Sequence, residues 1–408
     1  PSVYPLLYWV IRENTPPPSD GALSQLEIFM AEGGLLIIDD DNSDDLALPS
    51  AYGVDDIPVI VQDRTFNARG ALVYSNEDID EEDGFMGDTV IVNGIADPVL
   101  EIPAGLIRLR LLNGSNGRFY RFHFNDGRTF HKIATDGGFL ERPVSLTELI
   151  MSPGERNEII VDFSDGRAAM LVSGPPQSAR EGRDRDEGRN RDGRRDRDDR
   201  RDGEGRREGR GGRGFFAGGM NDSFEVMELR VNPALPAFRS QVPGQLNVIE
   251  RPPVVPSQPE RTFVLNMRMN PGGRGAPRGS VGHAAGAHGA MQMSMGINGQ
   301  MMDTNIINER VRRGVWERWR VENDDGHHPF HVHGCSFLVL SQDDVPVREE
   351  DAGWKDTVWV NNSAAFMARV AWSSRFSSST RLTSDAVITR SSTSSEVRRR
   401  RVISRSAT

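Results

Sequence analysis

The sequence predicts an all-β protein built from tandem β-sandwich domains. Short runs rich in Val, Ile, Leu and aromatic residues recur along it, and several alternate with charged residues as half-buried strands do. Turn signals such as Asn93-Gly94 and Asp126-Gly127 separate these runs, as hairpins and sandwich corners require. Signals for helices are weak. A chain of 408 residues has room for roughly two to three domains.

The expected strands fall into two groups, which indicates two sandwich domains. The first group comprises Ile57–Asp63, Asp88–Asn93, Leu106–Leu112, Arg118–Phe124 and Asn157–Phe163. The second group comprises Arg261–Met267, Val315–Glu322, Phe337–Leu340 and Thr357–Val360.

Four segments have compositions that do not predict a folded core. Residues 175–219 become an Arg/Asp/Gly repeat with few apolar side chains, which predicts a disordered, solvated loop. Its resemblance to RNA-binding RGG segments is weakened by the interleaved acids. Residues 236–260 are Pro-rich and predict an interdomain linker. Residues 271–296 are rich in Gly, Ala and Met, and residues 371–408 form a Ser/Arg tail unlike the sequence before it.

Charge and composition narrow the functional classes. The formal charge is −10, although residues 180–213 carry 14 Arg against 11 acids. The predicted folded part is therefore acidic, which argues against nucleic acid as a partner. No apolar run approaches the roughly 18 residues of a membrane span, so none is expected. One cysteine, Cys335, excludes an internal disulfide framework.

Three histidines close together indicate a metal site. His328, His331 and His333 lie within the string HHPFHVHG, and strand alternation places His331 and His333 on one face. Three buried imidazoles would each need a hydrogen-bond partner, so metal ligands explain the cluster better than a core does. Imidazole suits copper, zinc and iron, which leaves the metal open. His327 lies outside the pattern, and we interpret it as a bystander.

The string HPFHVHG is similar to the third-domain copper motif of multicopper oxidases, the family of laccases, bilirubin oxidases and copper-efflux oxidases. The resemblance runs from about Gly34 to Met367, and both termini depart from the family. Within this range, the segments that read like the family are residues 34–41, 55–66, 105–122, 133–144, 146–163 and 352–360.

The resemblance implies Greek-key cupredoxin-like domains, with the first nearly absent and the third truncated. On this basis residues 1–55 would be a remnant of the first domain with a linker, 56–235 the second domain and 261–370 the third. It also implies a periplasmic or extracellular location.

The resemblance further implies copper, up to four ions in an intact member. His328 would bind the type 1 copper, His331 the type 2 copper and His333 one type 3 copper. Such proteins oxidise Cu(I), phenolic or bilirubin-like substrates and reduce O2 to water.

The chain lacks the first-domain His-x-His pairs and the C-terminal His-Cys-His string, and Cys335 is not the expected thiolate. We therefore expect fewer coppers and no four-electron reduction of O2 by this chain. A non-catalytic copper-binding cupredoxin scaffold is the alternative, and a mononuclear zinc hydrolase is a more distant one.

A second group of residues predicts Cu(I) binding, because thioether sulfur is a soft ligand. A Met-rich insertion occupies this place in copper-efflux oxidases. The alternative is a flexible linker that happens to contain methionine. The candidate residues are His283, His288, Met291, Met293, Met295, Met301 and Met302.

Overall fold

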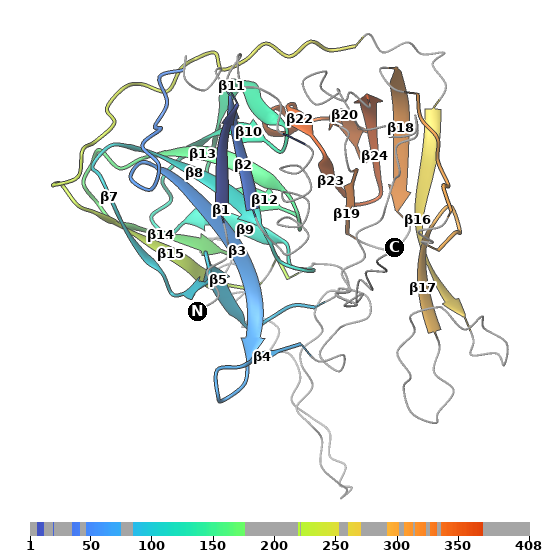
Figure 1. Ribbon diagram of the computed structural model, residues 1–408, viewed down its shortest axis with the longest axis horizontal. Coiled ribbons are helices and arrows are strands. Elements are labelled where there is room, and N and C mark those ends of the chain that lie inside the picture. The colour runs from blue at the N-terminus through green and yellow to red at the C-terminus, as the bar shows by residue number, and fades with distance from the viewer. Residues whose placement is uncertain are drawn as a thin grey trace, which may run out of the picture.

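The computed structural model describes most of the two predicted sandwiches (Figure 1). The described residues are 6–11, 19, 35–40, 46–74, 85–175, 219–220, 222–252, 260–270, 292–301, 306–312, 315–323, 327–332 and 336–369. Residues 6–11, 35–40, 267–270, 292–295 and 369 are described by their backbone alone.

The second domain is a sandwich of two facing sheets around one apolar core (Figure 1). The larger sheet has the order β11 (Gly138–Leu146), β10 (Phe130–Thr135), β13 (Arg156–Asp162), β8 (Leu106–Asn113), β3 (Asp56–Phe66), β5 (Thr89–Val92), β6 (Ile95–Ala96), with β4 (Leu72–Val73) paired to β3. The smaller sheet has the order β12 (Leu149–Met151), β9 (Tyr120–Phe124), β14 (Ala169–Ser173), β15 (Phe224–Val231), β7 (Val99–Ile102). Burial alternates along β3 and β9, as expected for strands with one face in a core.

The third domain consists of one large sheet with a small sheet packed on it. The large sheet has the order β17 (Gln292–Ile297), β16 (Glu260–Asn270), β18 (Trp316–Asn323), β24 (Ser363–Arg369), β20 (Ser336–Gln342), β21 (Val345–Pro346), with β22 (Trp354–Lys355) paired to β20. The small sheet pairs β19 (His328–His331) with β23 (Thr357–Val360). A short 3-10 helix, η1 (Glu349–Asp351), precedes β22. Phe263, Trp319, Phe330, Phe337 and Phe366 fill the space between the sheets.

The two domains repeat one topology. In the second, β3 is parallel to β8 and antiparallel to β5; in the third, β16 is parallel to β18 and antiparallel to β17. An Asn-Gly turn follows β5 and β17, and both Asn93 and Asn298 have positive φ angles, of 50° and 52°. Each side-chain oxygen accepts the backbone N–H of Ile60 or Val264 in the neighbouring strand. This shared turn explains why Asn-Gly recurs at matching places in the sequence.

Two further described segments belong to neither sandwich. β1 (Leu6–Ile11) and β2 (Leu35–Asp40) form a separate parallel pair. The Pro-rich segment after β15 packs on the outer face of the larger sheet, where Leu246 and Ile249 are buried. At its start the Phe238 carbonyl accepts the N–H of Leu106. The described part of the predicted linker is therefore packed against the second domain.

The predicted strands are confirmed with shifts of a few residues at their ends, and Thr357–Val360 has the predicted bounds. The expectation that residues 271–296 contribute nothing to the folded core is wrong at its end, because Gln292–Ile297 pairs with β16. The all-β cupredoxin-like class is confirmed. The Arg/Asp/Gly loop and the Ser/Arg tail lie almost wholly outside the described residues.

The third-domain core yields a first prediction. Phe366 is fully buried, and its ring centroid lies 4.3 Å from that of Phe337. Phe366→Ala should lower the free energy of unfolding of this domain by about 3–5 kcal/mol, because a cavity replaces the ring. The second domain contains no tryptophan and four of the six tryptophans lie in the third, so intrinsic tryptophan fluorescence during denaturation mainly follows the third domain. The control Val345→Ala, at a side chain 62% exposed, should change the free energy by less than about 0.5 kcal/mol; equal effects would contradict the packing described.

Candidate metal centre

Two of the three predicted imidazoles lie on the small sheet of the third domain. The antiparallel register of β19 and β23 places His331 opposite Thr357. Phe330, which precedes His331, is buried in the core, and its ring centroid lies 5.8 Å from that of Phe263. Strand alternation therefore directs His331 away from this core. Both His328 and His331 are half-buried.

The ring of His331 is held through its Nδ1 atom. Nδ1 lies 2.9 Å from Thr357 Oγ1, 3.0 Å from the Asp356 carbonyl oxygen and 3.4 Å from Asp356 Oδ1. Metal-binding histidines commonly donate one ring N–H to a carbonyl or carboxylate, which fixes the tautomer and the orientation of the ring. In that arrangement a metal ion at His331 would be bound through Nε2.

His327 and His328 have different surroundings. His328 Nδ1 lies 2.6 Å from the Pro329 carbonyl oxygen, a contact within its own strand. His327 Nδ1 accepts a hydrogen bond of 3.2 Å from Trp359 Nε1. Its ring centroid is 6.0 Å from that of Phe119, which belongs to the second domain. His327 is therefore part of an aromatic contact between the domains, which the sequence analysis did not predict.

Several predicted ligands lie outside the described residues, namely His333, His283, His288, Met291 and Met302, and so does Cys335, which was not predicted to be a ligand. Met301 is described and is 51% exposed. The backbone of Met293 and Met295 belongs to β17. The register places Met295 opposite Met267 and Met293 opposite Met269, so four methionine positions share one face of the β16–β17 ladder. Met267 and Met269 were not predicted, because this pairing crosses more than 20 residues of intervening chain.

The described donor set fits only part of a copper site. Among the described residues, no three His, Cys, Asp or Glu are arranged to hold a metal ion. The anchored imidazole of His331 suits copper, and the site residues His328, His331 and His333 remain a prediction as a set.

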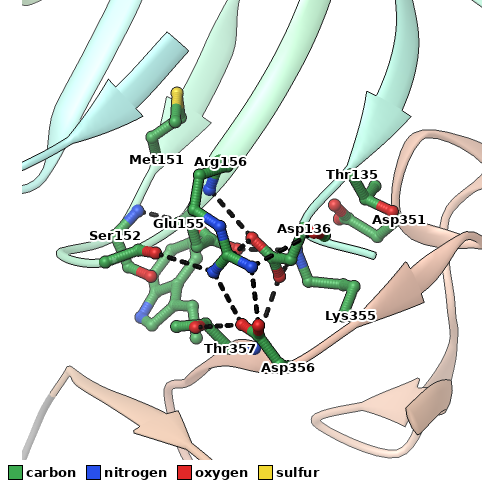
Figure 2. Close-up of polar contacts among 12 residues, drawn as sticks. Thr135, Asp136, Met151, Ser152, Glu155, Arg156, Asp351, Lys355, Asp356 and Thr357 are labelled. Carbon is green, nitrogen blue, oxygen red and sulfur yellow. Dashed lines mark hydrogen bonds and ion pairs between the residues drawn. The ribbon is translucent and has the colours of Figure 1, made fainter. Parts of the chain in front are cut away.

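A cluster of buried charges joins the two domains beside His331 (Figure 2). The side chain of Asp136, in the turn after β10, is fully buried. Its carboxylate accepts the backbone N–H of Arg156 at 2.8 Å and that of Thr357 at 3.3 Å. Lys355, from β22 of the third domain, lies 3.3 Å from the same carboxylate and 2.9 Å from Glu155. Asp136 thus bonds to both domains at once.

A fork of two hydrogen bonds runs from the second domain to the residue beside His331. Arg156 Nη1 donates to Asp356 Oδ1 at 2.7 Å, and Arg156 Nη2 donates to Asp356 Oδ2 at 2.6 Å. Thr357 Oγ1 also donates to Asp356 Oδ1, at 2.8 Å. Figure 2 shows the guanidinium group of Arg156 between the carboxylates of Asp136 and Asp356.

Further close contacts join the second and third domains at this junction. The Nζ atom of the buried Lys132 lies 3.1 Å from Oδ1 of Asp351 in η1. The backbone N–H of Gly137 donates to the Trp354 carbonyl at 2.7 Å. A Cβ atom added at Gly137 would lie 2.7 Å from the Cβ of Trp354, so no larger residue fits without displacing one domain.

The junction sets the protonation of its charged groups. Burial alone would lower the pKa of Lys355, but the charges of Asp136 and Glu155 outweigh it and raise this pKa above its ordinary value. Burial alone would raise the pKa of Asp356, but hydrogen bonds from His331 and Arg156 outweigh it and hold this pKa well below the usual range. Lys132 and Lys355 hold the pKa of Asp351 low against burial in the same way. These groups are all charged at neutral pH.

The sequence analysis gave Lys355 and Asp356 no role, and so did not predict this network. A signal was present, since Lys355 and Asp356 interrupt an apolar run at the start of a predicted strand. A charge there needs a buried partner.

Sequence comparisons connect the chain to two families. Residues 278–375 match the model of the multicopper oxidases. Residues 2–54 match the model of a domain of unknown function, over the range predicted to be a first-domain remnant. The cell division protein FtsP of Salmonella typhimurium is 33% identical over 342 residues, and that of Escherichia coli is 32% identical over 342 residues. Each alignment covers 84% of this chain and 60% of the relative, so the chain spans about three fifths of the length of these relatives.

Solved structures of multicopper oxidases share the fold. The laccase-like multicopper oxidase CueO from Ochrobactrum sp. has a TM-score of 0.63 and 28% identity, covering 84% of this chain and 66% of the other. The multicopper oxidase McoA from Aquifex aeolicus has a TM-score of 0.59 and 28% identity, covering 83% and 64%. Over the part of the chain that the structure describes, no helix is long and apolar enough to span a membrane.

The buried charges yield a second prediction. Lys355→Met should destabilise the third domain by about 3–5 kcal/mol, because Asp136 and Glu155 would be left buried without their cation. Denaturation followed by tryptophan fluorescence measures the change. Arg230→Gln breaks an ion pair with Glu228 whose arginine is 57% exposed, and it should leave the midpoint unchanged. A Lys355→Met variant as stable as the native chain would show that these charges are not paired as described.

The same groups yield a third prediction, on pH. Asp351 and Asp356 have pKa values held below 3.8, so the stability they contribute is complete above that pH and falls as the pH drops below it. Lys355 has a pKa raised above 10.5, so its contribution is complete below that pH and falls as the pH rises past it. The unfolding midpoint should be flat between these limits. In Lys355→Met the alkaline decline should shrink, and an unchanged decline would count against the assignment.

Proposed function

This chain is a relative of the multicopper oxidases with their tandem cupredoxin fold, and from that premise we propose that its third domain carries part of a copper centre. By the family motif, His328 would bind a type 1 copper, His331 a type 2 copper and His333 one type 3 copper. The observation that carries the proposal is the anchoring of His331 Nδ1 by Thr357 and the Asp356 carbonyl. This is the surrounding that a metal-binding imidazole needs.

The residues of this chain could bind copper, but they do not supply all the ligands that the reduction of O2 by four coppers needs. By resemblance, four coppers need ten histidines, and the chain contains eight in all, of which three match the family motif. The remaining ligands would have to come from outside this chain. When copper is bound in a complete centre, it supplies one-electron transfer from the substrate and reduction of O2.

Cu(I) is the substrate that the chain supports best among those implied by the family. The four methionine positions of the β16–β17 ladder, with Met291, Met301, Met302, His283 and His288 nearby in sequence, form a region rich in soft donors. Phenolic and bilirubin-like substrates remain alternatives. A place in the cell envelope accords with this family resemblance.

A second candidate function is a non-catalytic scaffold. The relatives at 32–33% identity are named cell division proteins, and the name states no oxidation. The junction of the two domains is held by the half-buried Arg156–Asp356 ion pair and the buried Lys355–Glu155 ion pair, which require no metal. A scaffold could thus keep its shape whether or not copper is bound.

A copper titration tests the proposal, as the fourth prediction. His331→Ala should weaken Cu(II) binding by at least about 10-fold in a chelator competition, because it removes the anchored ligand. The control His131→Ala removes an imidazole on β10 that contacts Ser145, and it should leave the affinity unchanged. O2 uptake with a phenol should not exceed that of free copper. Equal copper binding by the native chain and His331→Ala would reject the copper centre and favour the scaffold.

A further inference from the structure

The second domain reaches the predicted copper ligand through two side chains. Arg156 grips Asp356 with two parallel hydrogen bonds, and Asp356 contacts His331 by both its carbonyl and its carboxylate. Arg156 and Asp356 are 200 positions apart in sequence and belong to different domains. The fork therefore exists only while the domains are docked.

Arg156 is itself fixed by its own domain. Its Nη2 atom donates to the Asp136 carbonyl at 3.1 Å, and its Nη1 atom donates to the Gly154 carbonyl at 3.2 Å. Its backbone N–H is bound by the buried carboxylate of Asp136. A planar guanidinium held by two carbonyl groups offers Asp356 one geometry, which the flexible ammonium of a lysine does not.

Asp356 receives its orientation from three sides as well. Arg156 holds both carboxylate oxygens, Thr357 Oγ1 donates to one of them, and the backbone N–H of Val332 donates to the Asp356 carbonyl. Strand pairing alone fixes the carbonyl. The carboxylate, which lies 3.4 Å from His331 Nδ1, is held by Thr357 at one oxygen and by Arg156 at both.

We propose that copper binding at His331 and docking of the second domain on the third are coupled through the Arg156–Asp356 fork, which makes Arg156 a positioning residue for the copper ligand. The proposal rests on the copper centre proposed above. Arg156 would act on a bound metal only through Asp356 and His331. Partners of metal ligands at this remove commonly change metal affinity by about 10–100-fold. Because coupling is reciprocal, bound copper must strengthen docking by the same factor.

The test compares two arginine variants in the full chain. Arg110 forms a matching fork, with Nε and Nη2 at 2.8 and 2.7 Å from the carboxylate of Asp56, and both residues belong to the second domain. Cu(II) affinity is measured by chelator competition, and the Cu(II) EPR spectrum reports the geometry at the ligand. Arg156→Gln should bind Cu(II) about 10–100-fold more weakly with altered nitrogen couplings, and Arg110→Gln should stay within about twofold of the native chain.

Further variants and a thermal-unfolding measurement complete the test. Arg156→Lys should recover part of the affinity, since the charge returns without the fork. Copper should raise the thermal midpoint of tryptophan fluorescence in the native chain and raise it less in Arg156→Gln. A folded Arg156→Gln variant with native copper affinity overturns the coupling. If that variant does not fold, Arg156→Lys and Asp356→Asn decide by the same criterion. Equal affinity of the native chain and His331→Ala would instead reject the copper centre itself.

Discussion

The burial of Asp136 between the two domains is the constraint on which the rest of the arrangement depends. A carboxylate without solvent must be paired, and here the partners are Lys355 and the backbone of Thr357 from one domain and Arg156 from the other. Separating the two sandwiches would leave Asp136 without Lys355 and without the backbone N–H of Thr357. The charges therefore favour this relative orientation of the domains. They do so even if an apolar interface of the same size would give equal or greater stability.

That orientation also determines the surroundings of the predicted copper ligand. β23 contains Thr357 and pairs with β19, so the strand that meets the second domain is the strand that anchors His331. The aromatic contact of His327 and Trp359 with Phe119 adds an apolar patch to the same junction. A metal ligand placed at a domain boundary in this way is sensitive to docking, whereas one in the middle of a sandwich would not be.

The repeat of topology between the domains explains where the methionine ladder arises. β16 and β17 take the places of β3 and β5, and each pair ends in an Asn-Gly turn that ties back to the longer strand. In the second domain this pair carries apolar residues such as Val61 and Val92. In the third domain the register of this pair places methionines opposite one another. A standard structural element has thus acquired residues suited to soft-metal chemistry, which is consistent with the Cu(I) proposal.

The sequence by itself determined the all-β class, most strands, the Asn-Gly turns and the spacing of His328, His331 and His333, because each depends on residues within a few positions of one another. It could not determine the partners of Lys355 or Asp356, which lie 200 positions away, nor the alignment of Met267 with Met295 across an intervening segment. The burial of the charged residues and the pairing of their charges arise only when the two folded domains meet. Only the tertiary structure decided which carboxylate meets which cation, and hence how the second domain contacts the predicted copper ligand of the third.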